Sequence, residues 1–270
     1  MKKVAGLLAL VALVLTELAF ASAVVTSSTG NVTAQVGSGV PRPVRTGDRL
    51  NQGDTVVTAA GSSTVMKFDD GQVAALGPNS RMTITAYRYD PASQRGSVLL
   101  SLISGAMRGI TGMIGKNSPE NVSVRAATAT IGIRGTDFSV ITNAGVIFAE
   151  VNGGKISFTF NGQTVEVDTG RAILTLPNGT VSQGTINQIY AALQGTDIGR
   201  EIIAALGSLT ALSSEINRVF PGIPTQGQVQ GQGQGPAETE PGVGIGSGRG
   251  SPTGPSGGGG SGGGGTASPN

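Results

Sequence analysis

Short apolar runs separated by Gly-containing turns constrain the fold of this chain more than any other feature of its sequence. Apolar runs at residues 65–68 and 73–76 flank Asp69-Asp70-Gly71, and Asp-Gly between two such runs is a strong signal for a β-hairpin. Further turn signals follow at Asn152-Gly153-Gly154 and Asn161-Gly162. Many short strands joined by Gly-rich turns are typical of an all-β sandwich, barrel or solenoid.

The stretch from Val122 to Ile141 is the expected centre of this fold. Two alternating apolar runs flank a compact, turn-like unit, which consists of Gly132, Ile133, Arg134, Gly135, Thr136, Asp137 and Phe138. We predict an all-β domain over residues 24–180, a twisted solenoid-like or sandwich arrangement of short antiparallel strands. Its Val, Ile and Leu residues are numerous enough for a core that folds without disulfides.

The residue types that are missing exclude several kinds of chemistry. The 270-residue chain contains no His and no Cys, so it has no imidazole base, no thiolate nucleophile and no His or Cys metal ligand. The formal net charge is +2 and no run of Lys or Arg occurs, which argues against nucleic acid as a partner. We therefore expect a non-catalytic protein that uses no cofactor and no metal.

The first 23 residues form a predicted signal peptide. Lys2-Lys3 is a basic start, residues 4–15 are an unbroken apolar run, and Ala21-Ser22-Ala23 fits an A-x-A cleavage site. A membrane anchor is the weaker alternative, because the run is too short for a hydrocarbon core of about 30 Å and Glu17 would lie inside a longer span. Cleavage after Ala23 predicts a periplasmic or secreted protein without a membrane span.

Four motifs in a fixed order mark a family resemblance. They are G-D-x-L-x-x-G-D at residues 47–54, D-G at 70–71, G-x-x-R at 105–108, and V-R-x-x-T-A-x-x-G-I-R-G-T-D-F at 124–138. With these motifs, residues 26–142 resemble the FecR-like periplasmic domain family.

The resemblance implies an all-β periplasmic domain whose strands form a twisted, solenoid-like arrangement. In signalling members of the family, the domain follows a transmembrane helix and a cytoplasmic anti-sigma segment, and it relays a signal from an outer-membrane receptor. This chain departs from that plan, since a cleavable leader is expected before the domain and no cytoplasmic part is expected. The resemblance therefore carries over the domain but not sigma-factor regulation.

Three aspartates are candidate site residues, each with a structural alternative. Asp48 and Asp54 lie on either side of one loop, where a cation or paired-carboxylate site is conceivable. We favour turn caps, in which each carboxylate accepts hydrogen bonds from backbone N–H groups. Asp70 and Gly71 resemble a fragment of a calcium loop but lack its remaining ligands, so we favour a hairpin turn there.

Arg134 and Asp137 are the candidates for recognition within the central stretch. An Arg134 that faces a partner could hold a carboxylate with its guanidinium fork. We favour an internal role, in which Arg134 is buried between core strands, bonds carbonyls or a carboxylate, and stabilises the fold.

Helical periodicity replaces the strand pattern over residues 183–220. Apolar residues from Ile186 to Val219 fall near one stripe of a 3.6-residue period. Gly195-Thr196-Asp197 interrupts this pattern, and Thr196 or Asp197 can cap the helix that follows. We favour docking of this stripe on the β domain, and an oligomer through residues 186–219 is the alternative. Residues 221–270, rich in Gly, Pro and Gln, predict a disordered tail.

Two functions fit these features. The first is a non-catalytic binding module of the cell envelope, which recognises a protein or glycan partner and in a sharper form senses a signal. The second is a structural surface protein that assembles through its Gly-rich tail. A carboxylate-based hydrolase is a weaker third, because it needs two carboxylates that converge in one cleft.

Overall fold

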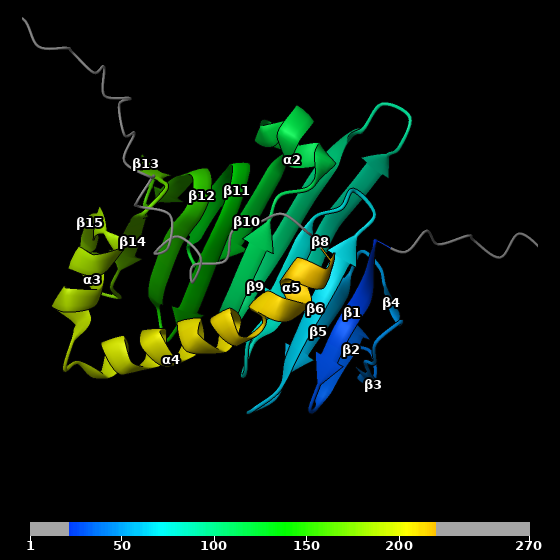
Figure 1. Ribbon diagram of the computed structural model, residues 1–270, viewed down its shortest axis with the longest axis horizontal. Coiled ribbons are helices and arrows are strands. Elements are labelled where there is room, and N and C mark those ends of the chain that lie inside the picture. Colours follow the sequence, from blue (N-terminus) through cyan, green and yellow to red (C-terminus); the bar gives the residue numbers. More distant parts are fainter. Residues whose placement is uncertain (1–21, 220–270) are drawn as a thin grey trace, which may run out of the picture. The chain divides into compact units, whose positions relative to one another are not determined.

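The structure is a computed structural model that describes residues 22–219 (Figure 1). Most of the predicted signal peptide and the predicted disordered tail lie outside the described residues. A single mixed sheet of fifteen strands precedes three C-terminal helices, so the prediction of a mostly β fold followed by a helical segment is confirmed. The strands are β1 (Ala23–Thr29), β2 (Val32–Val36), β3 (Arg42–Pro43), β4 (Arg49–Leu50), β5 (Asp54–Thr58), β6 (Ser63–Phe68), β7 (Val73–Leu76), β8 (Arg81–Asp90), β9 (Arg95–Ile110), β10 (Val122–Ala126), β11 (Ala129–Asn143), β12 (Val146–Phe160), β13 (Gln163–Asp168), β14 (Arg171–Thr175) and β15 (Val181–Thr185). The helices are α2 (Met113–Asn117), the 3-10 turn η1 (Pro119–Asn121), α3 (Ile186–Leu193), α4 (Asp197–Ala211) and α5 (Ser213–Val219).

Strand pairing divides the sheet into two layers. The covered layer has the order β4-β1-β6-β7-β9-β11-β12-β14-β15, and the open layer has the order β3-β2-β5-β8-β9-β10-β11-β12-β13. The long strands β9, β11 and β12 belong to both layers, because each pairs with different neighbours along its two halves. Only β9 and β10 pair in parallel among the described strands.

A glycine with positive φ lies where each long strand passes from one layer to the other. These are Gly105 in β9 (φ 89°), Gly135 in β11 (φ 61°) and Gly154 in β12 (φ 79°). The crossing reverses the alternation of side chains, as expected where an irregularity interrupts a strand. In β11 the core side chains are odd-numbered before Gly135, for example Ile133, and even-numbered after it, for example Phe138.

Two expected turns are in fact bends within continuous strands. The turn-like unit at residues 132–138 is the corner of β11, and Asn152-Gly153-Gly154 is the corner of β12. A Cβ on Gly154 would lie 2.3 Å from the carbonyl oxygen of Gly135, so the two corners are packed directly against each other. The predicted hairpins at Asp70-Gly71 and Asn161-Gly162 are confirmed.

The main core lies between the two layers. Its largest buried side chains come from both layers, for example Phe68 and Phe138 from the covered layer and Phe158 and Leu100 from the open one. The short helix α2 contributes the fully buried Ile114 to the same core. Burial of aliphatic and aromatic area at about 25 cal/mol per Å² is the main stabilising contribution to such a domain.

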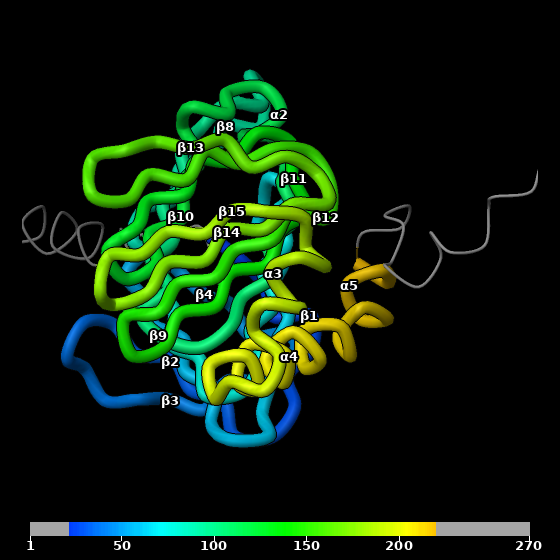
Figure 2. The backbone as a smooth tube through the Cα atoms, turned by 90° about the vertical axis from the view of Figure 1, so that its left-hand side faces the viewer, coloured from blue at the N-terminus to red at the C-terminus, as the bar shows by residue number. Residues whose placement is uncertain are grey.

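The C-terminal helices pack on the outer face of the covered layer (Figure 2). The apolar stripe of α3 and α4 lies on residues such as Ile141 and Phe148, and α5 places Ile216 on Val65 and Val73. The structure therefore confirms the favoured prediction that this stripe docks on the β domain. Thr196 caps α4, as expected, by accepting a hydrogen bond from the backbone N–H of Gly199 at 2.9 Å. None of the helices within residues 22–219 combines the length and the apolar character needed to cross a membrane.

Candidate functional site

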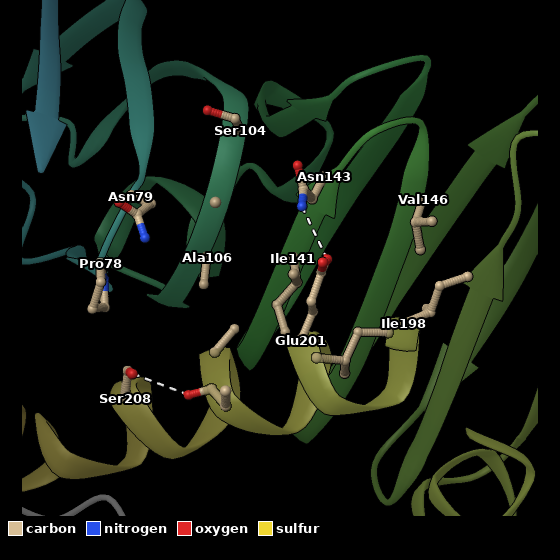
Figure 3. A pocket seen from close by; sticks show the side chains of 14 residues that line it. Pro78, Asn79, Ser104, Ala106, Ile141, Asn143, Val146, Ile198, Glu201 and Ser208 are labelled. Carbon is tan, nitrogen blue, oxygen red and sulfur yellow. Dashed lines mark hydrogen bonds between the residues drawn. The ribbon is translucent and has the colours of Figure 1, made fainter. Parts of the chain in front are cut away.

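A cleft of about 470 Å³ lies between α4 and the covered layer (Figure 3), and we call it the α4 cleft. Its volume is within the usual range for small-molecule sites. Its floor is apolar, with Ala106 and Ile141 from the sheet facing Ile198 and Ile202 from the helix. Polar side chains lie at its rim, and they are Asn79, Ser104, Asn143, Glu201 and Ser208.

The cleft is open because the residues that face each other across it are small. Gly105 and Ala106 of β9 and Ala204 and Ala205 of α4 all line the cleft, and none of them has a side chain large enough to fill it. At the rim, the side-chain amide of Asn143 donates to Oε2 of Glu201 at 3.0 Å (Figure 3). Glu201 is the only ionisable residue among the residues that line the cleft.

A buried ion pair lies on the same face of the covered layer. Arg108 of β9 donates from Nε to Oδ1 of Asp137 at 2.8 Å and from Nη2 to Oδ2 at 2.6 Å. The two side chains are only 6% and 9% exposed. Arg108 also donates from Nη1 to Oγ of Ser213 at 3.3 Å, so the pair connects the sheet to the start of α5. A two-bond arginine–carboxylate contact has a fixed geometry and aligns these elements.

Glu150 of β12 extends this polar group under α3. The hydroxyl of Tyr190 donates to Oε2 of Glu150 at 2.6 Å. Burial raises the pKa of Glu150 above its ordinary value, and the hydrogen bond from Tyr190 only partly offsets that effect. Burial and the nearby Glu150 carboxylate both raise the pKa of Tyr190, which therefore stays protonated and remains the donor.

Most residues of the central motif at 132–138 lie at the corner of β11. Thr136 is buried, and its N–H donates to Oγ1 of Thr111 at 2.7 Å. Phe138 is buried in the core, where its ring lies so close to Gly109 that any Cβ there would be 2.6 Å from it. Gly132 and Gly135 belong to the same strand, and Gly135 supplies the positive φ of the corner.

The preferred internal role for Arg134 is wrong. Arg134 is exposed, and the buried arginine that holds Asp137 is Arg108. The reversal of side-chain alternation at Gly135 explains the error, because Arg134 and Asp137 lie on opposite sides of that corner. A signal for Arg108 was present in the sequence, since it is the last residue of the G-x-x-R motif at 105–108.

The three candidate aspartates lie in turns or directly after them. Asp48 accepts a hydrogen bond from the N–H of Arg45 at 2.8 Å, and Asp54 accepts one from the N–H of Asn51 at 2.8 Å. Both contacts have the form of a turn cap, and Asp54 also forms an ion pair with Arg42 at 3.1 Å.

Asp70 lies in the β6–β7 hairpin with Gly71, which has a positive φ of 84°. Its carboxylate accepts from the N–H of Gln72 at 3.1 Å and from the N–H of Ile114 at 3.3 Å. The hairpin is thereby connected to α2. Throughout residues 22–219, no group of three or more Asp or Glu side chains is arranged to hold a metal ion.

The outer face of the open layer, which we call the open face, carries no helix among the described residues (Figure 2). Most of its side chains are polar, and Ile103 of β9 is an exposed apolar residue on it. Paired positions place a row of hydroxyl and arginine side chains across it, and the row is Thr83, Ser101, Arg125, Thr130, Thr159 and Thr164. Some of these hydroxyls bond each other, such as Thr159 and Thr164 at 2.8 Å.

Three arginines of the open face are exposed: Arg88, Arg125 and Arg134. Within the part of the chain that the structure describes, none of them forms an ion pair. The carboxylates of the edge strand β13, Glu166 and Asp168, are both paired with Lys155, at 2.7 and 3.2 Å. The open face therefore presents unpaired positive charge.

Comparison with known families supports the resemblance found in the sequence. Residues 54–157 match the family model described as FecR protein. The match includes the G-x-x-R motif and the block at 124–138, and it confirms the resemblance to the FecR-like family. These residues are therefore similar to a FecR-type domain.

Two crystal structures, each described as that of a candidate anti-sigma factor from Parabacteroides distasonis, are similar to this chain. The first is 18% identical, with a TM-score of 0.42, and the match covers 52% of this chain and 64% of that chain. The second is 16% identical, with a TM-score of 0.41, and the match covers 63% of this chain and 80% of that chain. The chain thus spans just under two thirds of the first structure. A search of curated proteins found no significant match.

Proposed function

We propose that this protein is a non-catalytic interaction module of the cell envelope, exported by its leader, which recognises an anionic partner through the open face. The observation that carries the proposal is the difference between the two outer faces of the sheet. One face is covered by α3, α4 and α5, whereas the other presents Arg88, Arg125 and Arg134 to solvent.

The chemistry of the open face supports a protein or glycan that carries carboxylate or phosphate groups. Arginine binds such groups with two parallel hydrogen bonds and is less strongly hydrated than lysine, so it suits this kind of contact. The FecR-type domain and the absence of His and Cys from the sequence support a binding role rather than catalysis. The partner of a signal-sensing module would bind reversibly and with a strong dependence on salt.

The test is capture of envelope components from the native host by the leaderless chain. Charge reversal at two open-face positions, Arg125→Glu and Arg134→Glu, should reduce capture, and added salt should do the same. Arg200→Glu is the matched control, because Arg200 is exposed on α4, away from the open face. Equal capture by all variants, with unchanged circular dichroism, would show that the open face is not the recognition surface.

A further inference from the structure

We infer that the α4 cleft is a binding site for a small amphiphile with an aliphatic body and a cationic amine head. The cleft has the volume and the apolar floor that such a body requires, at about 470 Å³. An apolar void of this size between a helix and a sheet is unusual in a well-packed protein, where side chains normally fill such space.

The charge of the head group follows from the rim. Glu201 is the only ionisable residue that lines the cleft, and its carboxylate points from α4 towards the mouth of the cleft, where Asn143 holds Oε2 (Figure 3). An amine at the mouth would gain an ion pair with Glu201 while its chain lies on the half-buried Val146 and Ile198. A carboxylate head would face a like charge at the same place, and an alcohol would gain neither effect.

Three probes of equal chain length separate these cases: octylamine, octanol and octanoate, measured by calorimetry on the leaderless chain. We expect octylamine to bind about fivefold more tightly than octanol, as for an exposed ion pair, and octanoate to bind most weakly. Glu201→Gln keeps an acceptor for Asn143 and should abolish the preference for the amine. Glu215→Gln, on α5 and outside the lining of the cleft, is the charge control and should change nothing.

Ala205→Leu places bulk inside the cleft and should reduce binding of all three probes by at least about tenfold, since it removes the space that they occupy. Ala192→Leu is the volume control, because Ala192 is exposed on α3 and does not line the cleft. Equal affinities for the three probes, or binding that Ala205→Leu leaves unchanged, would overturn the inference. So would the absence of binding at millimolar probe.

A second inference concerns the mature N-terminus, and it rests on the proposed export. We propose that the leader is removed after Ala21, so that Ser22 is the first residue of the mature chain. Ala19-Phe20-Ala21 fits the same A-x-A requirement as Ala21-Ser22-Ala23. Water would hydrolyse the Ala21–Ser22 peptide bond, giving a carboxylate on Ala21 and an amine on Ser22.

The fold distinguishes the two sites, because Ser22 and Ala23 belong to it. Ser22 donates its N–H to the carbonyl of Leu50 at 2.8 Å, and its own carbonyl accepts from the N–H of Asp69 at 3.3 Å. Ala23 is fully buried in β1 and pairs with both Leu50 and Phe68. Cleavage after Ala23 would remove these contacts from the mature protein.

The test is the intact mass and the N-terminal sequence of protein recovered from the envelope of an expressing bacterium. A chain that begins at Ser22 supports the inference, and one that begins at Val24 overturns it. An uncut chain contradicts the proposed export itself, so the two failures are distinguishable. A chain made to begin at Val24 should also melt at a lower temperature than one that begins at Ser22, and equal melting would count against the structural argument.

Discussion

Loss of the Asp137 carboxylate should destabilise the domain strongly. Asp137→Ala leaves the guanidinium of Arg108 buried, only 6% exposed, without its two-bond partner. Breaking a buried ion pair by removing one partner costs about 3–5 kcal/mol, which lowers the melting temperature of a domain of this size by about 6–20 °C. Arg134→Ala removes an exposed side chain and should change the free energy of unfolding by less than about 0.5 kcal/mol.

Urea denaturation followed by circular dichroism measures both effects. Together with the single variant Arg108→Met, the double variant Arg108→Met/Asp137→Ala completes a thermodynamic cycle. The double variant should be more stable than Asp137→Ala alone, because no unpaired charge remains buried. The reasoning would be refuted if Arg134→Ala were more destabilising than Asp137→Ala. It would also be refuted if the stability lost by the double variant equalled the sum of the losses of Arg108→Met and Asp137→Ala.

Three further predictions follow from other parts of the fold. Burial raises the pKa of Glu150, so the folded state binds more protons than the unfolded state. The contribution of this group to stability should therefore fall as the pH rises above 4.5, the ordinary pKa of the carboxyl group. Glu150→Gln, which keeps an acceptor for Tyr190, should weaken that decline in urea denaturation between pH 4.5 and 8, and an unchanged slope would contradict the assignment. Gly154→Ala should cost at least about 1 kcal/mol more than Gly162→Ala, because both glycines have positive φ but only a Cβ on Gly154 would meet a backbone oxygen at 2.3 Å; equal melting temperatures would contradict the close packing of the corners. Deletion of residues 221–270 should leave the concentration dependence of light scattering unchanged, and a loss of association would instead favour assembly through the Gly-rich tail.

The sequence was sufficient to predict several of the strands, because their signals are local. Alternating runs on either side of Asp70-Gly71 and Asn161-Gly162 specify hairpins through the conformation that Gly allows, and the structure has both. The cap of α4 at Thr196 is local in the same sense. The resemblance to the FecR family was also recognisable, because its motifs lie in a fixed order.

The corners of the long strands were not predictable in this way. Asn152-Gly153-Gly154 has the composition of a turn, but β11 and β12 pair on both sides of it, and this pairing over long sequence distances makes it a bend. The face on which Arg134 lies depends on that bend, since side-chain alternation reverses at Gly135. If side-chain alternation is extended through Gly135 without the bend, Arg134 is predicted to be buried in place of Arg108.

The α4 cleft could not be predicted from the sequence either. The apolar stripe of α4 predicted docking, but an unfilled volume depends on which small residues of the sheet and of α4 come together to line it. That arrangement is set by the packing of β9 against α4, which no local pattern specifies.

Arginine modification in the intact host envelope tests the central claim most directly. Phenylglyoxal labelling followed by mass spectrometry compares the reactivity of Arg88, Arg125 and Arg134 in the envelope with that in the purified chain, with the exposed Arg200 of α4 as the internal reference. Recognition through the open face predicts that the three arginines are protected in the envelope while Arg200 reacts equally in both samples. Full reactivity of all three in the envelope, or protection of Arg200 alone, would contradict it.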